Sequence, residues 1–144
     1  MDQTRETAVS FLNSTLQSAV FESFVVFTDS SQMRFISGEG QGAEPVWLAE
    51  TSAMTLQTAK RTHDQRSSVV GYLHALLGKQ IRQLDIDDAG VLSVHLGTAL
   101  IRVAPDTVNL ERIWSITPGA ADPAVQHAWR VSLNDERRIE FTPP

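Results

Sequence analysis

The sequence contains no cysteine and no long apolar run, and both absences restrict what the protein can be. Without cysteine there are no disulfides, iron–sulfur clusters, thiolate zinc sites or cysteine nucleophiles. No apolar stretch approaches the roughly 18 residues that a transmembrane helix needs, and the first residues lack the basic-then-apolar order of a signal peptide. We therefore expect a cytoplasmic protein that does not associate with a membrane.

Positive charge is also scarce. Twelve Lys and Arg residues stand against 17 Asp and Glu residues, which gives a net charge of −5 at pH 7. This balance disfavours binding to the phosphate backbone of nucleic acids and favours a partner with a basic surface. The length of 144 residues, 42% hydrophobic and 20% charged, is typical of one folded domain, so we predict a single domain over 1–144.

The residue sets that carry out common chemistry are missing as well. The histidines show neither the helical i, i+4 spacing of metal ligands nor a His-Glu-x-x-His motif. No Gly-x-Ser-x-Gly motif nominates a nucleophile, and the glycine-rich run at 38–42 does not lead into a helix that could bind phosphate. We predict no catalytic residues, no metal and no cofactor. The histidines are His63, His74, His95 and His127.

Carboxylates cluster in the run Asp-Ile-Asp-Asp-Ala-Gly that begins at Asp85. The run resembles the start of a calcium-binding loop, but Ala89 occupies a ligand position and Leu96 stands where the twelfth-position glutamate belongs. We interpret it instead as an exposed acidic turn. Because Asp85 and Asp87 alternate with aliphatic residues, they should share an outward face that Asp88 extends. These three carboxylates are our predicted contact with a basic partner.

Apolar residues recur at helical spacing in two stretches, which predicts two amphipathic helices. The first helix is expected to begin at Asp2 or Thr4, and the second at Thr62 or Asp64. Gly78 fits a left-handed cap at the end of the second helix. The first stripe consists of Ala8, Phe11, Leu12 and Leu16, and the second of Val69, Tyr72, Leu73, Leu76 and Leu77.

Elsewhere apolar and polar residues alternate, which predicts strands joined by short turns. Turns are expected at Asp88–Gly90, Gly97–Thr98 and Asn134–Glu136. The pattern indicates an α+β fold with two helices and a mainly antiparallel sheet. The expected strands lie at 24–28, 33–36, 83–87, 92–96, 101–103 and 129–133, with a returning strand that contains Ile139 and Phe141.

The chain also contains an approximate internal repeat. Glu44-Pro45-Val46-Trp47 recurs 67 residues later as Glu111-Arg112-Ile113-Trp114, and residues 12–16 align with residues 77–81. We interpret both indoles as buried anchors of the last strand of each repeat. Two unrelated units that share a local pattern are the alternative. The predicted organisation is two α-β-β-β repeats, at about 4–58 and 62–116, followed by a C-terminal β-hairpin at 125–142.

Four segments of the chain follow one another in the order Leu-x-Gly-x-x-Val, a hairpin and an acid-x-x-Trp strand. They are Leu76–Ile81, Gly90–Val94, Ile101–Asp106 and Glu111–Trp114. In this order, about two-thirds of the chain resembles small bacterial proteins that contain a domain of unknown function, often with the pattern repeated, and that are similar to immunity proteins. The chain departs from the family pattern in having Arg112-Ile113 before the indole and Gly97-Thr98 for an acidic turn. The resemblance implies an inhibitor of a bacterial toxin.

The sequence therefore favours a non-enzymatic protein-binding module, such as an immunity-type inhibitor of a basic bacterial toxin or nuclease. One alternative is a small enzyme or small-ligand-binding protein with a cleft between the repeats, lined by His95, Arg102 or Trp114. Another is a structural or assembly subunit that forms a homodimer through an exposed sheet edge.

Overall fold

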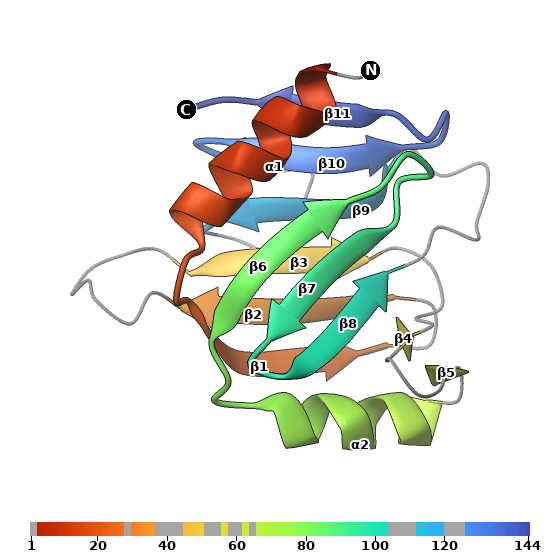
Figure 1. The fold of residues 1–144 in the computed structure, drawn as a ribbon. Helices are drawn as coiled ribbons and strands as arrows, with labels where there is room; N and C mark the ends of the chain where they lie inside the picture. The colour runs from red at the N-terminus through yellow and green to blue at the C-terminus, as the bar shows by residue number, and fades with distance from the viewer. Residues whose placement is uncertain are drawn as a thin grey trace.

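The computed structural model describes residues 3–27, 30–36, 45–50, 56–57, 62–63, 66–103, 112–119 and 126–144. These residues form two helices and eleven strands (Figure 1). The helices are α1 (Gln3–Thr15) and α2 (Arg66–Leu76). The strands are β1 (Val20–Val26), β2 (Ser31–Ile36), β3 (Val46–Glu50), β4 (Leu56–Gln57), β5 (Thr62–His63), β6 (Ile81–Ile86), β7 (Leu92–Leu96), β8 (Ala99–Val103), β9 (Arg112–Pro118), β10 (Arg130–Asn134) and β11 (Ile139–Thr142).

The strands form two antiparallel sheets that pack on each other. Sheet A has the strand order β1-β2-β3-β9-β10-β11, and sheet B has the order β5-β4-β8-β7-β6. Figure 1 shows sheet B crossing obliquely in front of sheet A, with α1 beside β6 and α2 beyond β1. The α+β class with a mainly antiparallel sheet is thus confirmed. Neither described helix is long and apolar enough to cross a membrane.

One hydrophobic cluster fills the space between the two sheets and the helices. Its largest fully buried side chain is Trp114, whose indole Nε1 donates a hydrogen bond to the Gly90 carbonyl at 3.1 Å. On the α1 side, the Phe11 ring lies 5.0 Å from the rings of Trp129 and Phe141, centroid to centroid. These contacts join α1 to the C-terminal hairpin, although the two are far apart in the sequence.

Both predicted apolar stripes face this core except at Leu77, which is exposed, and the prediction that the second helix begins at Thr62 is wrong. Helix α2 begins at Arg66, and Thr62–His63 instead forms strand β5 because it pairs with Leu56–Gln57 of β4. Helix α1 begins at Gln3, so Thr4 lies inside it; Asp2 and Asp64 lie outside the described residues. The buried stripe residues are Ala8, Leu12 and Leu16 in the first stretch and Val69, Leu73 and Leu76 in the second.

The chain has the same local geometry after α1 and after α2, at Ser18 and Gly78, which are 60 residues apart. Ser18 (φ 65°) and Gly78 (φ 86°) each turn the chain after a helix, which confirms the predicted cap role of Gly78. Each following strand has a β-bulge one residue after its first buried residue, Phe21 or Ile81. The junctions bond each other reciprocally: Ser18 N–H to Ile81 O (3.2 Å), Gly78 N–H to Phe21 O (2.8 Å), Ile81 N–H to Ala19 O (2.7 Å) and Phe21 N–H to Lys79 O (3.0 Å).

The predicted equivalence of the two tryptophans is wrong. Trp47 lies on β3, the third strand after α1, whereas Trp114 lies on β9, the fourth strand after α2. Trp47 pairs with Thr117, three residues from Trp114, so the alternation of side chains along β9 places the indoles on opposite faces of sheet A. Trp47 is only half-buried, and the Arg34 guanidinium lies 5.7 Å from its ring centroid. The buried-anchor interpretation therefore holds for Trp114 alone.

Helix α2 is tied to sheet B through the phenol of Tyr72. Its hydroxyl donates a hydrogen bond to the Leu100 carbonyl in β8 at 3.1 Å. Burial raises the pKa of the Tyr72 hydroxyl above its ordinary value of 10.0. The neutral phenol is thus the form that the folded protein favours.

The C-terminal hairpin follows the prediction closely. Strands β10 and β11 pair in the register Val131–Phe141 and Leu133–Ile139. The Asn134 side-chain oxygen accepts hydrogen bonds from the backbone N–H groups of Glu136 and Arg138, both at 3.0 Å, and so closes the turn. The hairpin adds the last two strands at one side of sheet A, with β11 at the edge.

Candidate functional site

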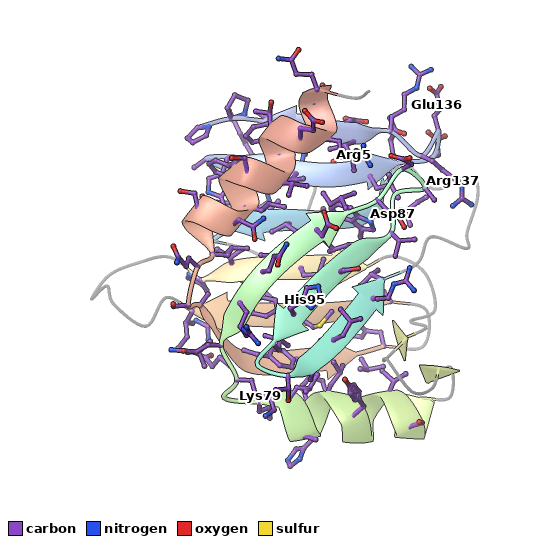
Figure 2. All side chains as sticks on the ribbon, in the orientation of Figure 1. Arg5, Lys79, Asp87, His95, Glu136 and Arg137 are labelled. Atoms are coloured by element: carbon purple, nitrogen blue, oxygen red, sulfur yellow. The ribbon has the colours of Figure 1, made fainter. Side chains whose placement is uncertain are left out.

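A cleft of about 470 Å³ lies between α1 and the segment that ends β6 and turns toward β7. All three carboxylates selected from the sequence line it. Figure 2 shows Arg5 and Asp87 at the same end of the molecule, where α1 and the β6–β7 turn come together. We call this the acidic cleft; its lining residues are Arg5, Glu6, Val9, Ser10, Asp85, Ile86, Asp87 and Asp88.

The position of one cleft wall depends on Asn13. Strand β6 is the edge of sheet B, and the Asn13 side chain takes the place of a neighbouring strand. Its amide Nδ2 donates to the Leu84 carbonyl at 2.9 Å, and its Oδ1 accepts from the Leu84 N–H at 2.8 Å. Nδ2 also contacts the Val9 carbonyl in α1 at 3.0 Å. The pair of bonds to Leu84 fixes the helix against the edge strand and satisfies polar groups that would otherwise lack a partner.

Asp87 closes the turn between β6 and β7, which forms the cleft wall that faces α1. Its Oδ1 accepts hydrogen bonds from the backbone N–H groups of Ala89 and Val91, each at 2.9 Å. Gly90 follows with a φ of 83°, a left-handed conformation that favours glycine. The side chain of Asp87 is therefore part of the turn structure, while its exposed position leaves the carboxylate charge open to solvent.

The other two aspartates are differently placed. Asp85 is exposed on β6, and its Oδ1 accepts only the adjacent Ile86 N–H, at 3.0 Å, among the hydrogen bonds of the described residues. Asp88 pairs with the Arg5 guanidinium at 2.5 Å, and 93% of the Asp88 side chain is exposed. Arg5 also donates to the Ile86 carbonyl at 3.5 Å. Because the carboxylate is solvated, this ion pair contributes at most about 1 kcal/mol to folding.

The acidic cleft thus presents four carboxylates and a single guanidinium. Two chain segments supply the carboxylates: Glu6 comes from α1, and the three aspartates come from the end of β6 and its turn. In the described part of the chain, no three His, Asp or Glu side chains are arranged to hold a metal ion. The chemistry offered by this surface is attraction of a cationic group, since its carboxylates carry a local excess of negative charge.

The remaining sequence candidates do not join this site. His74 is exposed on α2, His95 is half-buried on β7, and the His127 Nδ1 lies 3.0 Å from the Pro118 carbonyl. None of His95, Arg102 and Trp114 lines the acidic cleft, and Trp114 is fully buried beside Gly90. The run at 38–42, Glu44 and Glu111 lie outside the described residues, as does the side chain of His63.

Sequence reasoning missed the half of the cleft that α1 contributes. Arg5 and Glu6 are ordinary charged residues of a helix, and nothing in their spacing points to the β6–β7 turn about 80 residues away. The signal that could have helped is Asn13, a polar residue next to the apolar stripe of the predicted helix. Such a residue requires a hydrogen-bond partner, and here that partner is Leu84.

Comparison of the chain with protein-family models, with curated proteins and with solved structures gives no match.

Proposed function

We propose that the protein is a non-enzymatic binding module whose acidic cleft holds a cationic surface of another protein, as an immunity-type inhibitor of a basic bacterial toxin or nuclease would. The observation that carries the proposal is the convergence of Glu6, Asp85, Asp87 and Asp88 on one cavity from two separate chain segments. Four carboxylates that converge on one concave surface produce a stronger local negative potential than the same charges spread over a flat surface.

The ion pair between Arg5 and Asp88 supports this proposal. It shows that a guanidinium fits the geometry of the cleft, since the Arg5 Nη1 lies 2.5 Å from the Asp88 Oδ1. An arginine or lysine of a partner can form ion pairs with the carboxylates that Arg5 does not contact, such as that of Asp85. Charged groups of this kind act mainly on the association rate, which falls as salt rises.

The test uses a tagged form of the full chain to capture its partner from native lysate, followed by kinetics with the purified partner. Replacing Asp85, Asp87 and Asp88 together by Asn should slow association about tenfold at low salt. Stability should change by less than about 1 kcal/mol, because the amide that replaces the Asp87 carboxylate retains the side-chain oxygen that closes the turn, and the other two carboxylates are exposed.

The matched control is the triple variant Glu22→Gln/Asp135→Asn/Glu140→Gln, which removes three exposed carboxylates outside the cleft. Both triple variants change the net charge from −5 to −2. The control should associate at nearly the rate of the unaltered protein. Equal slowing in both variants would mean that only net charge matters, and unaltered association of the cleft variant would contradict the proposal.

A small cationic ligand is the second candidate function. It is favoured by the cavity volume of about 470 Å³, which lies within the roughly 300–1,000 Å³ range of small-molecule sites. The cleft also lies between α1 and β6, which come from different predicted repeats. Calorimetric titration with arginine methyl ester distinguishes the two candidates. Saturable binding that is lost in the cleft variant supports the small ligand, and no binding supports the protein partner.

A further inference from the structure

The acidic cleft already contains one cation, Arg5, and its placement is unusual for an arginine. Arg5 lies in the first turn of α1, where the partial positive charge of the helix terminus disfavours a cationic side chain. The side chain is nonetheless only 21% exposed and reaches across the cleft, so that its Nη1 lies 2.5 Å from the Asp88 Oδ1 and 3.5 Å from the Ile86 carbonyl oxygen. A residue that goes against its local preference in this way is expected at functional sites more than elsewhere.

Folding does not explain this arrangement. Helix α1 is already fixed to β6 by the hydrogen bonds of Asn13 and to the C-terminal hairpin by the ring contacts of Phe11. The carboxylate that pairs with Arg5 is 93% exposed, and an ion pair of this kind stabilises a fold only weakly. Ordering a long arginine side chain also costs conformational entropy. The main consequence of the pair is therefore that Asp88 is already occupied when a partner arrives.

We infer that Arg5 is an internal competitor for the acidic cleft, which an arginine side chain of the partner must displace from Asp88. The inference rests on the proposed function, in which the cleft holds a cationic surface of another protein. The contacts of Arg5 define the ligand, because a carboxylate and a main-chain carbonyl both accept hydrogen bonds there. A guanidinium has several N–H donors in one plane and can serve both acceptors at once. The group that replaces Arg5 is therefore a second guanidinium.

This competition makes the cleft selective for partners that carry more than one cation. A partner guanidinium that displaces Arg5 exchanges one ion pair with Asp88 for another, and so gains little at that position. The net attraction then comes from carboxylates that Arg5 does not pair with, such as those of Glu6 and Asp85. These two lie on the two walls of the cleft, Glu6 on α1 and Asp85 near the end of β6. A surface with several arginines can contact both walls at once, whereas a single cation cannot.

Calorimetric titration of the full chain with a short oligoarginine peptide tests the inference. Arg5→Met keeps an apolar stem in the cleft and removes the guanidinium. We expect this variant to bind the peptide about fivefold more tightly, which is the limit of about 1 kcal/mol for an exposed ion pair expressed as an affinity ratio. The matched control Arg82→Met removes an exposed guanidinium outside the cleft, and both variants change the net charge from −5 to −6. In about 0.15 M salt the control should bind like the unaltered protein, because screening limits the effect of a charge outside the cleft.

A double-mutant cycle with Asp88→Asn separates competition at Asp88 from a general effect of charge. In the Asp88→Asn background, Arg5→Met should lose most of its gain in affinity, because the ion pair that the peptide must displace is already absent. Circular dichroism and urea unfolding establish that each variant is folded.

Several results would overturn the inference. They are an affinity of Arg5→Met that is unchanged or lower than that of the unaltered protein, an equal gain in Arg82→Met, and an undiminished gain in the Asp88→Asn background. Failure of the proposed function has a different signature. In that case the peptide binds equally well, or not at all, to the unaltered protein and to the variant in which Asp85, Asp87 and Asp88 are replaced by Asn.

Discussion

The bond between Asn13 and the edge of sheet B allows the sharpest test of the fold. Replacing Asn13 by Ala removes both hydrogen bonds to Leu84, at 2.9 Å and 2.8 Å, and leaves the partly buried N–H and C=O of Leu84 without a partner. At a net value of about 0.5–1.5 kcal/mol each, the two bonds contribute about 1–3 kcal/mol. The better helix propensity of Ala returns about 0.6 kcal/mol. Because the unpaired groups of Leu84 add a desolvation penalty, we expect a net loss of about 1.5–2.5 kcal/mol.

This loss corresponds to a fall in Tm of about 5–9 °C for a domain of this size. Urea unfolding followed by tryptophan fluorescence measures the free energy directly. The control Ser14→Ala alters the neighbouring exposed residue of the same helix and should stay within about 0.5 kcal/mol of the unaltered protein. A loss in Asn13→Ala no larger than in this control would refute the reasoning.

Hydrogen exchange distinguishes the specific bond from a general loss of stability. The Leu84 N–H donates to the Asn13 side chain, so in Asn13→Ala its exchange should accelerate by more than the roughly 13- to 70-fold that the global free-energy loss alone produces. Amides in the middle of sheet A, such as that of Ile116, should accelerate no more than the global loss of stability requires. Unchanged protection of Leu84 would show that another group bonds its amide.

Two further predictions concern individual residues, and a third concerns metal binding. Gly90→Ala should lower the free energy of unfolding in urea by about 1–3 kcal/mol, because the residue has a φ of 83° and its new Cβ would lie 2.7 Å from a Leu133 methyl group. Gly71→Ala should raise the free energy of unfolding by up to about 1 kcal/mol, because nothing lies within 4 Å of the added Cβ. Tyr72 is the single tyrosine, so its near-ultraviolet absorbance titration should give a pKa above that of the unfolded chain. Since the folded state favours the neutral phenol, the stability that this group contributes is complete below about pH 10 and decreases as pH rises further. In Tyr72→Phe, the part of the stability loss at alkaline pH that comes from this group should disappear. Treatment with a chelator should leave Tm unchanged; a fall of several degrees that one added metal reverses would reveal a metal site.

The parts of the fold that local patterns determine could be predicted from the sequence. The period of Leu12 and Leu16 requires a helix with one buried face, and alternation around Val94 requires a half-buried strand. Gly78 adopts the left-handed conformation expected of a helix cap because other residues adopt it at a cost. Each of these inferences depends only on neighbours in the sequence.

The parts that depend on pairing with another segment could not be predicted in this way. Thr62–His63 has the pattern of a helix start, but it forms a strand because it pairs with β4, where Gln57 and Leu56 lie 5 and 7 residues upstream of their partners. The motif shared by Trp47 and Trp114 predicted equivalent strands, yet it describes only a local sequence that occurs on opposite faces of sheet A. The exposure of Asp85, Asp87 and Asp88 was predictable, whereas the cleft required knowledge of how α1 lies on β6, which depends on the bonds of Asn13.

The pairing of β3 with β9 has a consequence for the synthesis of the protein. Glu50 and Trp114 lie opposite each other in sheet A, although 64 residues separate them in the chain. At roughly 5–20 residues per second, a ribosome takes about 3–13 s to add this segment. During that interval the nascent chain has β3 with an unpaired edge, which is a template for aggregation. The chain therefore passes through a vulnerable period in every round of translation, and the arrival of β9 ends it.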